Sequence, residues 1–336
     1  MDTKDLDARN YTELLKGYVK TRDERALYGA EQISKTFIKN NILPEEIVNL
    51  HIQALLEIYP ELHDKIQSSM NFLLEAMISY GLAHQEYQIL REKQFEIKSE
   101  IHVAARMQKM LLQSNIPKLE DIDLGIISVP ANQMNGDYHH VVKGKDGSIS
   151  IAIADIIGKG IPAALSMSMI KYALDSFPEN IMSTDAILAS LNRVVERNID
   201  PSMFITMFYA QYKPDTGKFY YSSAGHEPGF FYHSKENSFT EIEAKGLVLG
   251  VNPDTTYLQY EQEIVKGDMI ILLTDGVTEC RKGEQFIERE EVLEVIRTFM
   301  HLPAQEIVNQ VYRYFERLQN FQLRDDFTLA ILKKVV

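Results

Sequence analysis

Residues 149–160 read ISIAIADIIGKG, and this stretch decides how the rest of the chain is interpreted. Its apolar first half is typical of a buried β-strand, and the strand pattern stops abruptly at Asp155. The glycine-rich segment that follows leads into a helical pattern that starts near Ile161. The sequence therefore places a carboxylate at the end of a buried strand.

The same arrangement occurs at other strand ends along the chain. The apolar run in MIILLTDG ends in an aspartate, the run in RDDFTLAIL is preceded by two, and NGDYHH contains another. The residues concerned are Asp137, Asp155, Asp275, Asp325 and Asp326. One acidic residue at a strand end usually satisfies turn amides. Several converging carboxylates repel one another unless cations neutralise them, and Mg²⁺ and Mn²⁺ prefer such oxygen ligands. The pattern predicts a two-metal hydrolytic centre.

Composition limits the class of protein. The 336 residues are 45% hydrophobic and 25% charged, which allows a sizeable core and favours two domains over one. A net charge of -13 argues against a nucleic-acid binder, whose footprint would be a basic face. The single cysteine, Cys280, excludes an internal disulfide and fits a reducing compartment. With no signal peptide or apolar run of about 20 residues, we expect a cytoplasmic protein without a membrane partner.

The chain divides into three predicted parts. Residues 1–82 show only helical patterns and no catalytic motif, so we expect a helical regulatory domain that binds a partner. Residues 83–117 continue as a helical linker with heptad spacing at Leu90, Ile97, Ala104 and Leu111. This seam fits a dimeric coiled coil or an amphipathic helix that lies on a domain core, and the sequence leaves both open.

Residues 118–336 alternate hairpin-like strands with pairs of helices. Strand patterns begin at Asp123, two helical patterns follow residue 160, more strands follow, and two further helical patterns precede the last strand. This order predicts an α+β protein whose third part is an α/β-β/α sandwich, in which two antiparallel sheets are flanked by helices. We expect the acidic strand ends to gather at one edge of that sandwich.

Five motifs now carry a family resemblance. NGDYHH, IADIIGKGIPAALSM, SAGHEP, TDGVTE and RDDFT resemble, in order and spacing, the SpoIIE-like branch of the metal-dependent protein phosphatase (PPM) family. The resemblance implies a protein serine/threonine phosphatase that uses two Mn²⁺ or Mg²⁺ ions to activate water for attack on a phosphoserine. No side chain of the protein needs to act as the nucleophile.

The resemblance also assigns roles to the acidic residues. Asp155 would bridge both ions, and the backbone carbonyl of Ile156 would face the second ion together with Asp137. Asp275 and Asp325 would hold the first ion. Asp326 is the neighbour or substitute of Asp325, because the paired aspartates leave that assignment open.

The chain departs from the family pattern at one position. Eukaryotic relatives read Asp-Gly-His-Gly, in which the histidine is the proposed acid for the leaving group, and Ile157 stands at that position here. His139, His140 and His226 are the remaining candidates, although histidines near turns are more often structural. Lys159 could attract phosphate, but a lysine in a glycine turn is usually only solvated.

The resemblance implies partners as well. The substrate would be a phosphorylated STAS-domain protein, an anti-sigma-factor antagonist, and its dephosphorylation would activate the general stress sigma factor. A kinase-like activator of the RsbT type would bind the N-terminal domain, with Leu74 and Ile78 as candidate contacts. These two side chains fit a bundle core or a homodimer interface equally well. A homodimer is expected. Two other functions stay open, a metal-dependent phosphodiesterase or nuclease and a catalytically inactive scaffold.

Overall fold

The structure is a computed structural model that describes most of the chain. The described residues are 3–22, 24–40, 42–61, 63–112, 116–117, 119–158, 160–177, 182–200, 202–282 and 285–336. They form two compact units, Met1–Lys98 and Ser99–Val336. The predicted division at residues 82 and 117 stays a prediction, and residue 118, where the third part would begin, lies outside the described residues.

The first unit is helical, as predicted. Its helices are α1 (Thr3–Thr21), α2 (Glu24–Lys39), α3 (Pro44–Ile58) and the first part of α4 (Asp64–Leu112). Pro44 is the first residue of α3, where its missing N–H costs no helical hydrogen bond. Phe37, Ile52 and Ala54 are buried between these helices. Tyr11 of α1 lies 2.8 Å from His51 of α3, between the hydroxyl and Nδ1.

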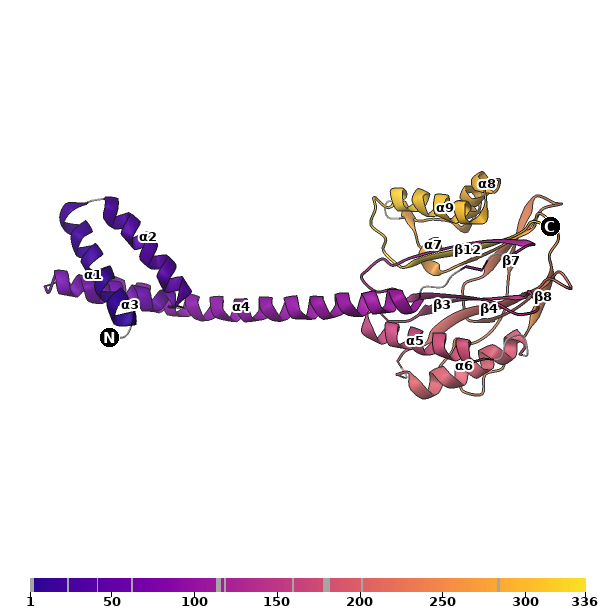
Figure 1. The fold of residues 1–336 in the computed structure, drawn as a ribbon, viewed down its shortest axis with the longest axis horizontal. Coiled ribbons are helices and arrows are strands. Elements are labelled where there is room, and N and C mark those ends of the chain that lie inside the picture. The colour runs from indigo at the N-terminus through magenta and orange to yellow at the C-terminus, as the bar shows by residue number, and fades with distance from the viewer. Residues whose placement is uncertain are drawn as a thin grey trace. The chain divides into compact units, whose positions relative to one another are not determined.

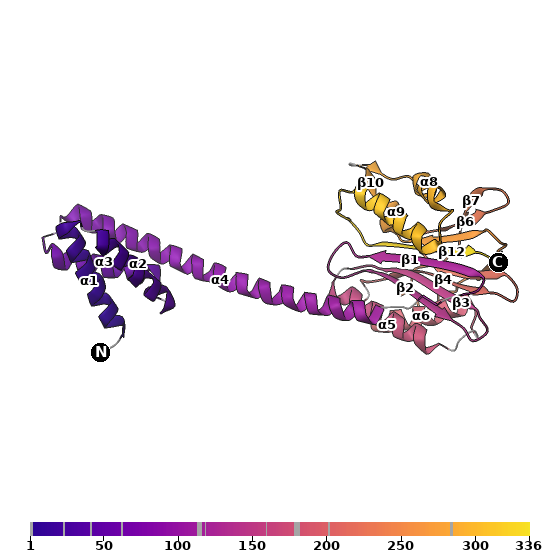
Figure 2. The ribbon, with the colours of Figure 1, turned by 45° about the horizontal axis from the view of Figure 1, so that its top comes forward.

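Helix α4 runs unbroken for 49 residues through the predicted linker (Figure 2). Its middle is solvent-exposed, and Leu90 and Ile97 of the heptad seam are both more than half exposed. Gln108 lies near the end of α4, inside the second unit, and is only 5% exposed because it packs against Asn135 and Met167 of the same unit. The side chain of Leu111 lies outside the described residues. At Gln108 the helix lies on a domain core.

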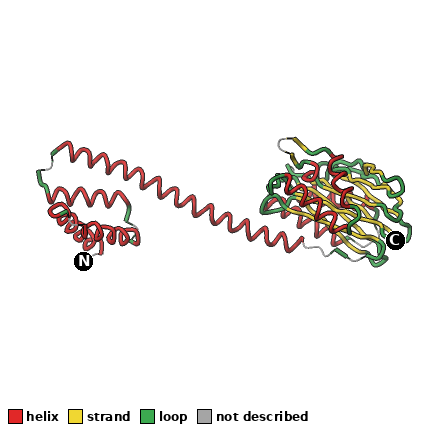
Figure 3. The backbone as a smooth tube through the Cα atoms, turned by 90° about the horizontal axis from the view of Figure 1, so that it is seen from above, coloured by secondary structure: helices red, strands yellow, loops and turns green. Residues whose placement is uncertain are grey.

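The second unit contains two five-stranded antiparallel sheets (Figure 3). One sheet has the order β1-β12-β9-β6-β7 and the other β2-β3-β4-β5-β8. The strands of the first sheet are β1 (Ile122–Val129), β6 (Gly229–His233), β7 (Ser238–Ile242), β9 (Met269–Leu273) and β12 (Phe327–Lys334). Those of the second are β2 (Asp137–Lys143), β3 (Ile149–Ile156), β4 (Ile205–Lys213), β5 (Lys218–Ala224) and β8 (Tyr260–Glu263). A short ribbon, β10 (Arg281–Lys282) with β11 (Gln285–Phe286), stands apart.

Helices cover the outer face of each sheet (Figure 1). Helices α5 (Ile161–Ser176) and α6 (Thr184–Asn198) share a buried cluster with β3 and β4. On the other sheet lie α8 (Arg289–Phe299) and α9 (Ala304–Leu318), preceded by the single turn α7 (Asp275–Thr278). These four layers confirm the predicted α/β-β/α sandwich.

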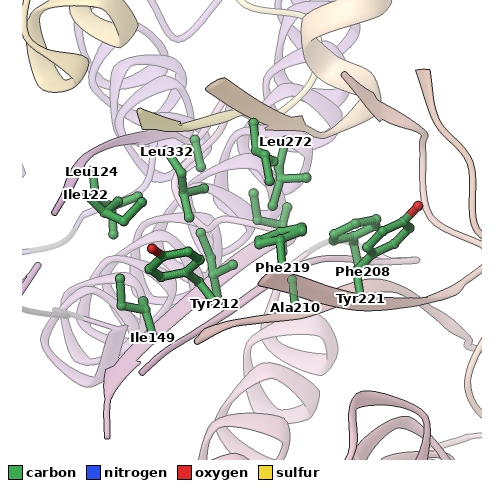
Figure 4. Packing of buried hydrophobic residues seen from close by; sticks show 14 of the residues in the cluster. Ile122, Leu124, Ile149, Phe208, Ala210, Tyr212, Phe219, Tyr221, Leu272 and Leu332 are labelled. Carbon is green, nitrogen blue, oxygen red and sulfur yellow. The ribbon is translucent and has the colours of Figure 1, made fainter. Parts of the chain in front are cut away.

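The inner faces of the two sheets form a third buried cluster (Figure 4). Side chains from opposite sheets interdigitate there, and Leu272 and Leu332 of one sheet lie over Phe219 and Tyr212 of the other. Because antiparallel strands alternate their side chains, a central strand such as β3, β4, β9 or β12 contributes to this core with every second residue and to a helix-covered cluster with the others. The double burial explains why the strands read as continuous apolar runs.

None of the described helices combines the length and the apolar character that crossing a membrane requires.

Candidate metal centre

The strand register brings the predicted acidic residues to one edge of the sandwich. Asp137 opens β2 and lies directly opposite Asp155, near the end of β3. In the other sheet, the pairing of Leu329 with Leu273 puts the start of β12 beside the end of β9. Asp325 and Asp326 immediately precede β12, and Asp275 follows β9 after one residue. The antiparallel pairing therefore gathers strand ends that lie far apart in the sequence.

A hydrogen bond joins the two sheets at this edge. The Thr274 hydroxyl, at the end of β9, donates to Oδ2 of Asp137 at 2.7 Å. Asp137 is 2% exposed, and burial is the main reason that its pKa is raised well above the ordinary value. The charges of Asp155 and Asp326 raise that pKa further. Asp137 is therefore a buried carboxyl group whose ionised form needs a compensating positive charge.

Asp155 lies at the centre of the acidic group. Burial and the nearby negative charges of three carboxylates raise its pKa to about 7. The three neighbours, in decreasing order of effect, are Asp275, Asp325 and Asp326. The pKa of Asp275 is likewise raised, first by burial and then by Asp325. Asp155 is therefore within electrostatic reach of Asp275, Asp325 and Asp326, and Asp137 is within reach of Asp155 and Asp326.

The structure gives the paired aspartates different surroundings. The Asp326 carboxylate accepts the backbone N–H groups of Ala131 and Gly136, which hold the loop between β1 and β2. Asp325 accepts the N–H of Asp326 through Oδ1 at 3.0 Å, and its charge acts directly on Asp155 and Asp275. Asp326 is thus engaged in holding a loop, and Asp325 is the better candidate for a metal ligand.

Ile156 contributes through its main chain. Its N–H donates to the Gly136 carbonyl at 3.2 Å, beside Asp137. A Cβ atom added at Gly136 would lie 3.5 Å from the Ile156 carbonyl oxygen and 3.7 Å from Oδ1 of Asp155. The carbonyl predicted to face an ion therefore lies next to the acidic group.

The donor set fits Mn²⁺ or Mg²⁺, because it consists of clustered carboxylates and a carbonyl. As they stand, no three acidic, histidine or cysteine side chains of the described part of the chain converge tightly enough to hold an ion. Two of the carboxylates are instead turned toward hydrogen-bond donors, Asp137 toward Thr274 and Asp326 toward the β1–β2 loop. The position of the residues favours a metal centre, and their mutual repulsion is what bound cations would neutralise.

Gly276 permits the close approach of the two acidic segments of the first sheet. A Cβ atom at this position would lie less than 3.0 Å from the backbone carbonyl of Asp326, a contact that real Cβ atoms do not make. We expect Gly276→Ala to lower the free energy of unfolding by about 1–3 kcal/mol, because backbone has to move. It should also lower turnover, since Asp275 and Asp325 are pushed apart.

Chemical denaturation and aryl-phosphate turnover measure these two effects. Gly17→Ala is the matched control, since an added Cβ atom meets nothing within 4 Å in helix α1. That substitution should leave turnover unchanged and stabilise the helix by up to about 1 kcal/mol. Wild-type stability and turnover in Gly276→Ala would show that the two acidic segments do not need the close approach at Gly276.

The candidate histidines lie in three different environments. His140 points away from Asp137, to the helix-covered face, where Nδ1 lies 3.0 Å from the Tyr138 hydroxyl. Burial lowers its pKa to about 4. His139 is half-buried on the same face of β2 as Asp137, and burial lowers its pKa as well. His226 is buried and contacts Thr206. Lys159 lies outside the described residues.

Gln108 is a residue of the site that its sequence pattern did not reveal. Its side-chain amide donates to the Asn135 carbonyl at 2.8 Å and accepts the Asn135 N–H at 3.1 Å. Asn135 in turn accepts the N–H of Asp137 through Oδ1. The end of α4 therefore holds the loop that carries Asp137. The only signal in the sequence was a polar residue within the predicted helical linker.

The fold is the one that PP2C-type phosphatase domains have. The SiaA-PP2C domain of Pseudomonas aeruginosa superposes with a TM-score of 0.62 over 72% of this chain and 98% of that one, at 18% identity. RsbX, solved in complex with magnesium, superposes with a TM-score of 0.50 over 66% of this chain and 98% of that one, at 17% identity. At these identities the likeness concerns the fold.

Sequence comparison identifies the family. Residues 145–335 match the family "Stage II sporulation protein E (SpoIIE)", and residues 9–83 match "Phosphoserine phosphatase RsbU, N-terminal domain". Phosphoserine phosphatase RsbU of Bacillus subtilis (strain 168) is 52% identical over 336 residues, which is the full length of both chains. The chain belongs to the RsbU family of SpoIIE-type phosphoserine phosphatases. This finding confirms the predicted enzyme class and goes against the nuclease and scaffold alternatives.

Proposed function

We propose that this phosphatase acts at a two-ion centre of Mn²⁺ or Mg²⁺ on a phosphorylated STAS-domain anti-sigma-factor antagonist. The ligands would be Asp137, Asp155, Asp275 and Asp325, with the backbone carbonyl of Ile156. The observation that carries the proposal is the strand register that brings these carboxylates to one edge, where burial and the neighbouring charges raise the pKa of Asp155 to about 7. The full-length likeness to an RsbU phosphatase supports the substrate class and a role in the general stress response.

The residues of the chain perform three tasks in this centre. Asp155 supplies negative charge from the second sheet. Asp275 and Asp325 supply it from the first sheet. Asp326 and Gln108 hold the loop that carries Asp137, each through backbone groups of that loop. When bound, the ions would supply the positive charge that activates a water molecule and neutralises the phosphoryl oxygens. Asp155 and Asp275 are therefore the proposed catalytic ligands.

A comparison of substrates tests this proposal. The full chain is incubated with a phosphoserine STAS-domain protein, an aryl phosphate, single-stranded DNA and a cyclic dinucleotide, each with Mn²⁺ and with a chelator. We expect metal-dependent phosphate release from the first two and cleavage of neither nucleic acid. Turnover of the phosphoprotein that survives chelation would refute the metal centre. Cleavage of the dinucleotide at a higher kcat/KM than the phosphoprotein would refute the substrate class.

We further propose that the N-terminal unit binds a kinase-like activator of the RsbT type and that α4 carries the signal to the metal centre. Residues 9–83 match an RsbU N-terminal domain, which supports a regulatory role. Leu74 and Ile78 of α4 are half-buried and stay the proposed contacts. The two hydrogen bonds between Gln108 and Asn135 connect the helix directly to the loop that leads into Asp137. A homodimer through the exposed seam of α4 is part of the same proposal.

If α4 carries the activating signal, stimulation of the phosphatase should depend on the rotation of the end of the helix relative to its start. Two residues inserted after Gln94 would rotate the end of α4 by about 200° relative to its start, whereas seven residues would restore the phase to within about 20°. We expect the two-residue variant to bind the activator normally but to lose its stimulation. A coupling free energy of about 1–3 kcal/mol corresponds to a stimulation of several-fold to over a hundredfold.

The seven-residue insertion is the matched control and should remain stimulated. Phosphate release is measured at saturating activator and Mn²⁺, and binding is measured by calorimetry. Equal stimulation of the two insertion variants would exclude transmission through the helix, even if the activator still bound.

A further inference from the structure

The motif SAGHEP lies at a crossing point between the two sheets. Strand β5 of one sheet ends at Ala224, and β6 of the other sheet begins at Gly229. Gly225 turns the chain with a φ of 65°, a conformation that residues with a side chain rarely adopt. A Cβ atom there would also collide with Val248. The turn delivers the next residue, His226, to the space between the sheets.

His226 is held on several sides. Its Nδ1 lies 2.8 Å from the Thr206 hydroxyl, and its backbone N–H donates to the Ser223 hydroxyl at 3.1 Å. The side chain is 9% exposed, and its Nε2 makes no well-formed hydrogen bond with the described residues. Burial lowers the pKa to about 4, while the nearby Leu273 carbonyl acts in the opposite direction. The ring is therefore neutral at neutral pH, which is not the protonated form that a general acid requires.

The neighbours of His226 belong to the acidic edge in both sheets. Thr206 of β4 lies directly opposite Asp155 of β3, so the two side chains are neighbours on the same face. Leu273 ends β9, and the next two residues are Thr274, which donates to Asp137, and Asp275. The His226 ring thus contacts Thr206, which lies beside Asp155, and it lies near the carbonyl of Leu273, two residues before Asp275.

We propose that His226 and Thr206 are positioning residues that hold the Asp155 side of the metal centre at a set distance from the Asp275 side. In the tautomer that this proposal requires, the Thr206 hydroxyl donates to Nδ1 of His226, and the Nε2–H faces the nearby Leu273 carbonyl without a well-formed hydrogen bond. The inference rests on the proposed metal centre. It gives the SAGHEP motif a structural task.

This link between the sheets matters because the ion assigned to Asp275 and Asp325 also needs Asp155. Asp155 lies in β3 of one sheet, whereas Asp275 and Asp325 flank β9 and β12 of the other, so a change in the separation of the sheets would alter the site of that ion. Residues that orient metal ligands without touching the ion typically contribute about 10- to 100-fold in metal affinity. Loss of the link through Thr206 and His226 should therefore weaken Mn²⁺ binding more than it weakens the fold.

The test compares Mn²⁺ binding by calorimetry in the full chain and its variants. Thr206→Val removes the hydroxyl at nearly constant volume, and Thr206→Ser keeps it. His226→Phe keeps a ring but removes both nitrogens. We expect Thr206→Val and His226→Phe to raise the Kd for Mn²⁺ by about 10- to 100-fold. Thr206→Ser should bind like the wild type, and KM for an aryl phosphate at saturating Mn²⁺ should be unchanged in all three.

A buried pair of hydroxyl groups away from the acidic residues provides the control. The hydroxyl of Thr184, at the start of α6, lies 2.7 Å from the hydroxyl of Ser222 in β5. Thr184→Val should lower the thermal midpoint without a change in the Kd for Mn²⁺. An unchanged Kd for Mn²⁺ in Thr206→Val, or an equal rise of that Kd in Thr184→Val, would overturn the positioning role of Thr206 and His226 and would leave the proposed metal centre intact. If His226→Phe fails to fold, the two Thr206 variants decide. Absence of Mn²⁺ binding in the wild type would overturn the proposed metal centre itself, and with it the positioning role of Thr206 and His226.

Discussion

Asp155→Asn is expected to lower kcat about a thousandfold while the fold without metal keeps its stability. Asp155 is the carboxylate on which burial and three acidic neighbours act together, so its charge is the one that bound cations neutralise most directly. Positive charge at a phosphoryl centre contributes several kcal/mol to catalysis, and about 4 kcal/mol corresponds to three orders of magnitude in rate. The amide of asparagine has nearly the same shape but carries no charge.

The expected effect on stability has the opposite sign to that on activity. Removing a buried charge that is repelled by its neighbours takes away an unfavourable interaction, so the melting temperature in chelator should equal or exceed that of the wild type. Asp146→Asn, in the exposed turn between β2 and β3, is the control and should keep full turnover. Wild-type turnover of Asp155→Asn at saturating Mn²⁺ would show that the centre is assigned to the wrong residues.

The paired aspartates should respond differently to substitution. We expect Asp325→Asn to lower turnover by about two orders of magnitude with little change in stability, because its charge acts on Asp155 and Asp275. Asp326→Ala should instead destabilise the protein by about 1–3 kcal/mol even in chelator. It removes the acceptor of the Ala131 and Gly136 N–H groups, and a buried donor without an acceptor is costly.

Denaturation in chelator and turnover at saturating Mn²⁺ separate the two roles. Asp326→Asn is the matched variant, because it keeps one acceptor oxygen and should lie between Asp326→Ala and the wild type in stability. A reversed pattern, in which Asp325→Asn is unstable and Asp326→Asn is stable but inactive, would exchange the assignments of the two residues.

The sequence was sufficient to predict the layers and the acidic edge. Apolar runs that end in aspartate place carboxylates at strand ends, and hairpins interrupted by helix pairs predict two sheets covered by helices; the structure has this arrangement. Such patterns are local, because they depend on alternation and turn residues within about ten positions. Asp155 and its place at the mouth of a buried strand could therefore be predicted from its own segment.

Contacts between distant segments could not be predicted in this way. Thr274 and Asp137 are 137 positions apart, and Asp326 and Gly136 are 190 apart. Which side chains meet at such separations depends on how one sheet lies on the other, and no period in the sequence encodes that. For the same reason the sequence left the linker open to a coiled coil or to a helix on a domain core, and it did not predict that Gln108 is buried on the loop that carries Asp137.

The most direct test of the metal centre is an anomalous-difference map from crystals of the full chain grown with Mn²⁺. We predict two peaks among Asp137, Asp155, Asp275 and Asp325, with the Ile156 carbonyl beside one of them and Asp326 still bound to the β1–β2 loop. Crystals of Asp155→Asn should lose at least one of the peaks. Peaks away from these residues, or none in crystals of an enzyme that remains active in chelator, would contradict a phosphatase mechanism based on this acidic edge.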